Sequence, residues 1–206
     1  MVICKNDSII ITNQDDFDNI IQDENNILSK YKKLTISDKH FNSPIDNIPS
    51  NIEYIHIIEN NDFNQPLDNL PYNLQELLIY SNNFNQSLSN LPAGLEILEL
   101  WCGNFNNPLN NLPESLKDLL IHTDNLLYDL NNLPRNLVKL CFRTYEPYNI
   151  SITNLPNTIK QLQLGFAFQS KIFHLPDQLQ FLSLHEKYKL SNLLTHIPNN
   201  VLIKYH

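Results

Sequence analysis

The sequence predicts a right-handed solenoid in which short repeats stack into a parallel β-sheet on a concave face, with a mostly extended convex side and little helix. Three regularities predict it. A Leu-Pro or Ile-Pro pair returns every 20 to 22 residues, an L-x-L alternation follows each pair, and an apolar residue, most often Phe, lies eight residues before each proline. A unit this short cannot bury its own apolar face, so neighbouring units must stack. The pairs end at Pro49, Pro71, Pro92, Pro113, Pro134, Pro156, Pro176 and Pro198.

Residues 1–26 precede the repeats and are predicted to form an N-terminal cap. The run from Ser8 to Thr12 is mostly isoleucine, which favours a strand. The run from Asp15 to Gln22 opens with acidic residues, which stabilise the first turn of a helix, so a short helix is expected there. Such a cap would give the first repeat the polar cover that terminal repeats need.

Residues 27–206 are predicted to form the solenoid, with about eight full repeats and one degenerate repeat, in a single domain overall. The degenerate repeat has Leu28 in the proline slot. Side chains two residues apart in a strand lie on the same face, so the two leucines of L-x-L point into the core, as Leu77 and Ile79 illustrate. The residues five, seven, nine and ten positions after each proline are therefore expected to face outward.

The segment that follows each strand reads F-N-x-P-L-x-N in the clearest repeats, and it has no helical period. Pro44, Pro66 and Pro108 favour an extended chain on the convex side. An internal spine is predicted from Phe41, Phe63, Phe84, Phe105, Leu126, Tyr148, Phe168 and Leu190. A second column, expected to bridge unpaired backbone groups at the turns, is Asn47, Asn69, Asn90, Asn111, Asn132, Asn154, His174 and His196.

The pattern F-N-x-P-L-x-N-L-P-x-x-L-x-x-L, which extends from Phe41 to Ile203, resembles the FNIP repeat, a short variant of the leucine-rich repeat. FNIP repeats are familiar from social amoebae and from the giant DNA viruses that infect amoebae. The resemblance implies a leucine-rich-repeat-like fold, a role in protein–protein interaction and, for a viral protein, a location in the host cytoplasm. Some viral members carry an F-box before the repeats and look like ubiquitin-ligase adaptors, but residues 1–26 are too few for an F-box.

Composition and charge exclude several classes of function. The 206 residues include 22 acidic and 14 basic side chains, and a net charge of −8 argues against nucleic-acid binding. Three glycines cannot supply Gly-rich phosphate loops. We find no run of about 18 apolar residues, so no membrane partner is expected. The absence of a secretory signal and three widely spaced cysteines favour a cytoplasmic protein.

The candidate site is a group of aromatic, histidine and charged residues at outward strand positions of the predicted concave face. Trp101 is the only tryptophan, and Tyr80 occupies the equivalent position one repeat earlier. Because Tyr, Trp and Arg dominate the energetics of protein interfaces, this group is a candidate binding site. The alternative is that the rings only pack on one another and cover the sheet. The predicted partner-binding residues are Tyr54, His56, Glu76, Tyr80, Glu99, Trp101, Asp118, His122 and Arg143.

Charge is divided unevenly along the chain. Residues 1–130 contain 19 acidic and 6 basic side chains, a net charge of −13, whereas residues 131–206 contain 3 acidic and 8 basic, a net charge of +5. A partner with a basic region would be steered to the acidic part. The alternative reading is that the asymmetry serves solubility alone, or that it favours antiparallel self-association.

No catalytic, cofactor-binding or metal-binding residues are predicted. His56, His122 and His185 face outward but are each about three repeats apart, roughly 14 Å, too far to share a metal ion. Cys102 and Cys141 are two repeats apart, about 10 Å, which is beyond the reach of a disulfide.

Two pairs of residues on adjacent strands are candidates for a catalytic role. These are the nucleophile–base pair Cys141 and His122 and the carboxylate pair Glu99 and Asp118. Both lie on an open face that offers no evident oxyanion site or water-excluding pocket, so we do not expect an enzyme.

The last repeat suggests an alternative function. Val201, Ile203 and Tyr205 alternate with polar residues just before His206, and no capping segment follows them in the sequence. An uncovered edge strand is a template for pairing with another chain. The first hypothesis is therefore a module that binds a protein partner of unknown identity on the concave face, and the second is a structural protein that forms a homodimer through this edge.

Overall fold

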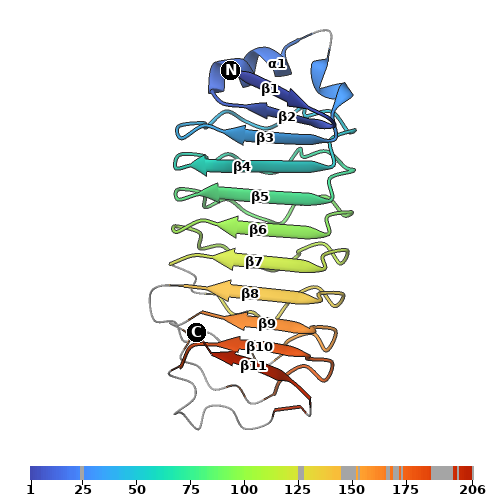
Figure 1. Cartoon of the computed structure of the whole chain (residues 1–206), viewed down its shortest axis with the longest axis vertical. Coiled ribbons are helices and arrows are strands. Elements are labelled where there is room, and N and C mark those ends of the chain that lie inside the picture. The colour runs from blue at the N-terminus through green and yellow to red at the C-terminus, as the bar shows by residue number, and fades with distance from the viewer. Residues whose placement is uncertain are drawn as a thin grey trace.

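The computed structural model describes residues 1–23, 26–124, 128–144, 152, 154–165, 168, 172, 174–186, 197–198 and 200–205. Its strands form one 11-stranded sheet whose spatial order is the order of the sequence, so they lie like rungs along the long axis (Figure 1). The elements are β1 Val2–Lys5, β2 Ser8–Ile11, α1 Gln14–Ile21, the 3₁₀ turn η1 Ile27–Lys30, β3 Lys33–Ser37, β4 Tyr54–Asn60, β5 Glu76–Ser81, β6 Ile97–Trp101, β7 Asp118–His122, β8 Lys139–Arg143, β9 Gln161–Leu164, β10 Phe181–Leu184 and β11 Leu202–Tyr205.

The sheet is parallel from β2 to β11, as the sequence predicts for a solenoid with little helix. Near-constant repeat length keeps equivalent positions in register, so that Glu76 pairs with Ile97, and Ile97 pairs with Asp118. Each row of equivalent residues therefore runs straight across the sheet. Among the described residues, no helix is long and apolar enough to cross a membrane.

The core is built from the inward strand positions and a stack of phenylalanine rings. Neighbouring rings from Phe41 through Phe63 and Phe84 to Phe105 are parallel, with centroids 5.9, 5.9 and 6.2 Å apart. This confirms the predicted spine over four repeats, and Phe168 is also buried. Phe17 of α1 closes the spine edge-on against Phe41, at 4.9 Å. The spine positions at residues 126, 148 and 190 lie outside the described residues.

The N-terminal segment contains the predicted strand and helix, as β2 and α1, and one strand that the sequence did not predict. β1 pairs antiparallel with β2 through a turn at Asn6, whose φ of 52° is in the left-handed region that Asn tolerates. The side chain of Asn13 accepts a hydrogen bond from the Asp16 backbone N–H at 2.8 Å and so caps α1.

The prediction that the tenth position after each proline faces outward is wrong for most repeats. Its members Ser81, Cys102, Thr123 and Thr144 are buried, whereas Glu59 and Glu186 are exposed and residue 166 lies outside the described residues. The chain turns inward where each strand ends, and the small polar side chain then hydrogen-bonds a carbonyl of the preceding turn. The Ser81 hydroxyl donates to Phe63 O at 3.1 Å, and the Thr123 hydroxyl donates to Phe105 O at 2.6 Å.

β4 is the exception because it contains a bulge. Its register with β5 shifts between Ile57 and Asn60, and Glu59 has a φ of 53°. The extra residue leaves Glu59 exposed and places Asn60 at the inward position that Ser81 occupies in β5. The Asn60 amide donates to Asp38 O and Phe41 O at 2.6 and 2.9 Å, and its oxygen accepts from the Phe63 N–H at 2.7 Å.

The backbone-bridging asparagines are not those that the sequence analysis chose. In the predicted column, Asn90 and Asn132 donate to the side chains of Asp68 and Asn110, and residue 196 lies outside the described part of the chain. Other asparagines bridge backbone groups, among them Asn60 and those that follow Phe41, Phe63 and Phe84. Asn64, for example, accepts from the Asn85 backbone N–H at 2.9 Å. The same arrangement recurs one repeat earlier and one repeat later, which ties the convex segments together.

β11 is the last strand of the sheet and pairs with β10. Val201, Ile203 and Tyr205 are partly buried against the core, while Leu202 is 67% exposed. The residues proposed for a dimer edge are thus half covered by their own repeat, and self-association through them stays a prediction.

Candidate functional site

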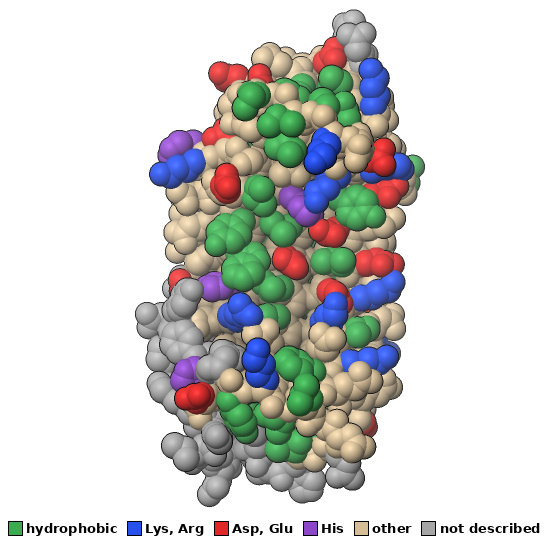
Figure 2. Space-filling model, viewed as in Figure 1, with side chains coloured by type: hydrophobic (Ala, Val, Ile, Leu, Met, Phe, Trp, Pro, Cys, Tyr) green, Lys and Arg blue, Asp and Glu red, His purple; other side chains and the backbone are tan. Residues whose placement is uncertain are grey.

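The nine predicted site residues all lie on the outer face of the sheet, but in three separate rows. Register places Tyr54, Glu76 and Asp118 in the first row, His56 and Glu99 in the middle row, and Tyr80, Trp101, His122 and Arg143 in the third. We call this third set the aromatic row. Figure 2 shows this face, where hydrophobic side chains are interspersed with charged ones and acidic side chains are concentrated over the upper strands.

The aromatic row contains a stack of three rings from three neighbouring strands, and the Arg143 side chain of the fourth strand reaches back toward it. The Tyr80 and Trp101 rings are 5.6 Å apart and 12° from parallel, and the Trp101 and His122 rings are 5.1 Å apart and 30° from parallel. The guanidinium carbon of Arg143 lies 6.0 Å from the Trp101 ring centroid. Strand spacing of about 4.8 Å sets these distances, because each ring stands on its own strand at the same register position.

The row is partly exposed and lies beside a hollow of about 370 Å³ at the carboxyl ends of the strands. Tyr80 is 50% exposed. Gly103 lies in the wall of the hollow, and a Cβ there would collide with Asn82 Oδ1 and lie 3.4 Å from Asp124 Oδ2. Gly103 therefore lets the Asn82 side chain pack directly against the backbone at this position.

Burial sets the protonation state of His122 in the aromatic row. It lowers the pKa of His122, and the positive charge of Arg143 acts in the same direction, while Asp124 opposes both. The imidazole is therefore neutral at pH 7, and Arg143 is the cationic member of the stack.

His56, Glu76 and Tyr54 form a polar group on the first repeats. His56 Nε2 lies 2.5 Å from Glu76 Oε1, and Tyr54 pairs in register with Glu76. Burial lowers the pKa of His56, helped by the charge of Lys33, and the hydrogen bond with Glu76 opposes the shift. These residues hold one another in place and do not belong to the aromatic stack.

The members of the two candidate catalytic pairs are not register partners in the sheet. Arg143, not Cys141, is the register partner of His122, and burial raises the pKa of the Cys141 thiol, which disfavours the nucleophilic thiolate. Asp118 bonds Lys139 at 2.7 Å, whereas Glu99 pairs in register with Leu120. Within the described ranges, no three His, Cys, Asp or Glu side chains converge as metal ligands.

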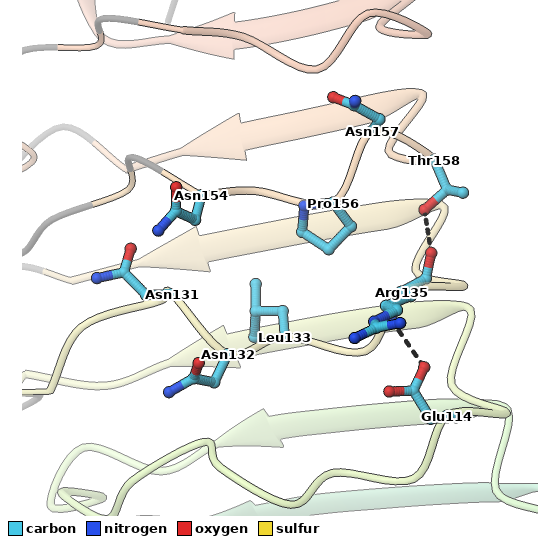
Figure 3. Close-up of a pocket in the computed structure, with 9 residues that line it drawn as sticks. All are labelled: Glu114, Asn131, Asn132, Leu133, Arg135, Asn154, Pro156, Asn157 and Thr158. Carbon is cyan, nitrogen blue, oxygen red and sulfur yellow. Dashed lines mark hydrogen bonds between the residues drawn. The ribbon is translucent and has the colours of Figure 1, made fainter.

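Sequence reasoning missed a second hollow, of about 510 Å³, between the Leu-Pro segments of neighbouring repeats (Figure 3). Asn131, Asn132 and Asn154 lie along one side of it, with Leu133 and Pro156 near its centre. On the other side, the Arg135 backbone N–H donates to Glu114 Oε2 at 2.9 Å, and the Thr158 hydroxyl donates to Arg135 O at 2.7 Å. In the sequence, the repeated N-L-P motif marked these positions only as turns.

The chain is similar to a solved repeat protein. It resembles the crystal structure of CroV588, described as a novel circular LRR protein, from the giant virus CroV, with a TM-score of 0.71 and 26% sequence identity. The match covers 99% of this chain and 31% of that chain, so this chain spans about a third of the length of CroV588. No family model matches the sequence, and no curated protein sequence matches it. The fold is thus a leucine-rich-repeat-like solenoid, and the FNIP assignment stays a prediction.

Proposed function

We propose that this protein binds a protein partner on the outer face of its sheet, with the contact centred on the aromatic row. The observation that carries the proposal is the stack of Tyr80, Trp101 and His122, in which Tyr80 is half-exposed. Arg143 lies against this stack, and a hollow lies beside it. Tyr and Trp rings bury large areas at little cost in conformational entropy. Together with arginine they are the residues that dominate interface energetics.

The likeness to a leucine-rich-repeat protein supports a binding role, because solenoids of this kind generally mediate protein–protein interaction and are typically not enzymes. The chemistry of the face agrees, since desolvation raises the pKa of the partly buried Cys141 thiol and so disfavours a nucleophilic thiolate. The similarity to a giant-virus protein and the resemblance to FNIP repeats extend the proposal to a host protein as the partner.

The test is affinity capture from amoebal lysate with three tagged proteins. These are the natural chain, the double variant Tyr80→Ala/Trp101→Ala, and Tyr72→Ala as a matched control, since Tyr72 is 72% exposed in the turn before β5. The natural chain and the control should retain the same specific protein, and the double variant should bind it about 30-fold more weakly, as expected for a hot-spot pair. Equal capture by all three proteins would refute the aromatic row as the binding surface.

A second copy of the chain is the alternative partner, and the 67% exposure of Leu202 on β11 favours it. In that case the molar mass measured by light scattering should rise with concentration to twice 24.1 kDa. Leu202→Lys should then return the protein to a monomer, because a charge at the contact opposes strand pairing. A monomer at all concentrations would exclude this alternative.

A further inference from the structure

We infer that Glu99, on the outer face of the sheet, pairs with a cationic side chain of the partner protein, a lysine or an arginine whose aliphatic stem packs on the apolar residues around it. The inference rests on the proposed function, because it names the chemistry by which that face would recognise its partner.

Glu99 is surrounded by apolar side chains on the outer face of the sheet. Its register partners are Leu78 on β5 and Leu120 on β7. The outward residues two positions before and after it on β6 are Ile97 and Trp101. These four neighbours, like Glu99 itself, are partly buried. The five residues, which we call the central patch, therefore place one carboxylate in the middle of four apolar groups.

The Glu99 carboxylate differs from the neighbouring carboxylates on β5 and β7 because it has no hydrogen bond or ion pair with another described side chain. Asp118 bonds Lys139 at 2.7 Å, and Glu76 bonds His56 at 2.5 Å. Figure 2 shows the same mixture on this face, where acidic side chains lie among hydrophobic ones. The acceptor oxygens of Glu99 are therefore available to a partner.

The charge around the central patch favours an approaching cation. Burial lowers the pKa of His56 and raises that of the Cys141 thiol, and the negative charge of Glu99 acts toward a higher pKa in both. The Arg143 guanidinium lies against the aromatic row and makes no ion pair with Glu99. The first 130 residues carry a net charge of −13, so a positively charged partner is steered toward this part of the face.

A partner that covers the central patch must supply a positive charge. Apolar cover would take water away from the Glu99 carboxylate without replacing its hydrogen bonds, which is strongly unfavourable. The stem of a lysine or arginine can instead pack on Leu78 and Leu120 while its charged end reaches the carboxylate. Glu99 therefore selects against apolar and acidic partners, and the leucines supply apolar area for the chosen one.

The test follows the indole N–H signal of Trp101, the only tryptophan, in NMR spectra. The probes are capped pentapeptides Ala-Leu-X-Leu-Ala, in which X is lysine, arginine, the neutral isosteres acetyllysine and citrulline, or glutamate. A cationic peptide should shift the Trp101 signal with a dissociation constant of about a millimolar, as expected for one ion pair and two apolar contacts. Its neutral isostere should bind at least about fivefold more weakly, and the glutamate peptide should cause no shift at about 10 mM.

Comparison of the lysine and arginine peptides shows which cation the central patch prefers. Equal binding of each cationic peptide and its neutral isostere to the natural chain would overturn the inference without any variant, and would leave Glu99 only the role of keeping the face soluble. An unshifted Trp101 signal with both cationic peptides at about 10 mM would overturn it as well.

Variants assign the preference to Glu99. Glu99→Gln should abolish the difference between the cationic and neutral peptides, and Glu99→Lys should reverse the preference toward the glutamate peptide. Asp118→Asn is the matched control, because Asp118 is an acidic residue of the same face that already bonds Lys139. An equal loss of preference in Asp118→Asn and Glu99→Gln would show that the general charge of the face, and not Glu99, selects the cation.

The outcomes separate this inference from the proposed function. Loss of partner capture in Tyr80→Ala/Trp101→Ala together with no preference for a cationic peptide would refute only the role of Glu99. A preference that depends on Glu99 together with unchanged partner capture would instead refute the aromatic row as the centre of the binding surface.

Discussion

At the scale of single residues, the aromatic row is a consequence of register. Tyr80, Trp101 and His122 are far apart in sequence, yet each stands nine residues after a proline and therefore at the same place on consecutive strands. Planar side chains at the strand spacing must either stack or splay, and here they stack. The row couples the environment of Trp101 to the charge state of His122.

That coupling predicts a pH-dependent fluorescence of Trp101. Protonated imidazole quenches a tryptophan in contact with it, and burial holds the pKa of His122 below the usual 6.5. Emission should therefore be constant above pH 6.5 and fall as the pH is lowered through the depressed pKa, with Asp124 and Arg143 as the charged neighbours that tune it. The fold should lose stability as the pH falls from about 6.5 to the depressed pKa of His122, because the unfolded chain binds this proton at a higher pH.

A fluorescence titration between pH 8 and pH 4.5 measures this effect, and His122→Gln is the control. The variant keeps a polar planar group beside Trp101 but has no proton to gain, so its emission should not change over this range. A pH step of equal size in the variant would show that a group other than His122 is responsible.

At the scale of elements, the bulge of β4 decides both the end of the aromatic row and the packing of one repeat. The extra residue lets Asn60 turn inward, where its amide bonds three backbone groups. Those groups belong to two different convex segments, so Asn60 joins neighbouring repeats as Ser81 and Thr123 do with a single hydroxyl each.

We expect Asn60→Ala to destabilise the protein by about 3 kcal/mol, since three hydrogen bonds at about 1 kcal/mol each are lost and buried backbone groups are left unpaired. Urea unfolding followed by circular dichroism measures the change. The neighbouring Asn61→Ala, at an exposed position, should shift stability by less than about 0.5 kcal/mol. Similar losses for the two variants would contradict the role assigned to the Asn60 amide.

The sequence predicted the periodic elements well and the non-periodic ones poorly. The strands and the Phe spine followed from spacing, because Leu77, Ile79 and Phe84 repeat at fixed intervals and each interval fixes a direction in a stacked repeat. The inward turn of Cys102 could not be read from alternation, since it occurs where the strand has ended and the period of two no longer holds. Backbone contacts of Asn64 depend on turn geometry, which spacing alone does not specify.

The candidate site was predictable to the same extent. The row of Tyr80, Trp101, His122 and Arg143 followed from counting residues after each proline. The hollow beside it was not predictable, because it is lined by Asn60 and Asn61 next to the bulge at Glu59 and by turn residues such as Asn82, and these leave no periodic signal.

At the scale of the whole molecule, the sheet is a one-dimensional array in which each strand is paired only with its immediate neighbours in the sequence. The stability of such an array is the sum of the stabilities of its repeats and of the interfaces between neighbouring repeats. A destabilising substitution in one repeat should therefore affect only the repeats next to it. Trp101 on β6 lies near the middle of the array and His122 on the next strand, well inside both ends.

A destabilising substitution near one end of the sheet should therefore leave the aromatic row folded. Leu182 is fully buried in β10, and Leu182→Ala should cost about 2–5 kcal/mol of local stability. Hydrogen exchange should then accelerate in β9 to β11 while β4 to β6 keep their protection, and Ile36→Ala, a buried mirror variant in β3, should accelerate β2 to β4 instead. If either variant accelerates all strands equally, the solenoid unfolds as one cooperative unit, and a partner seated on the aromatic row would then stabilise every repeat rather than only those it touches.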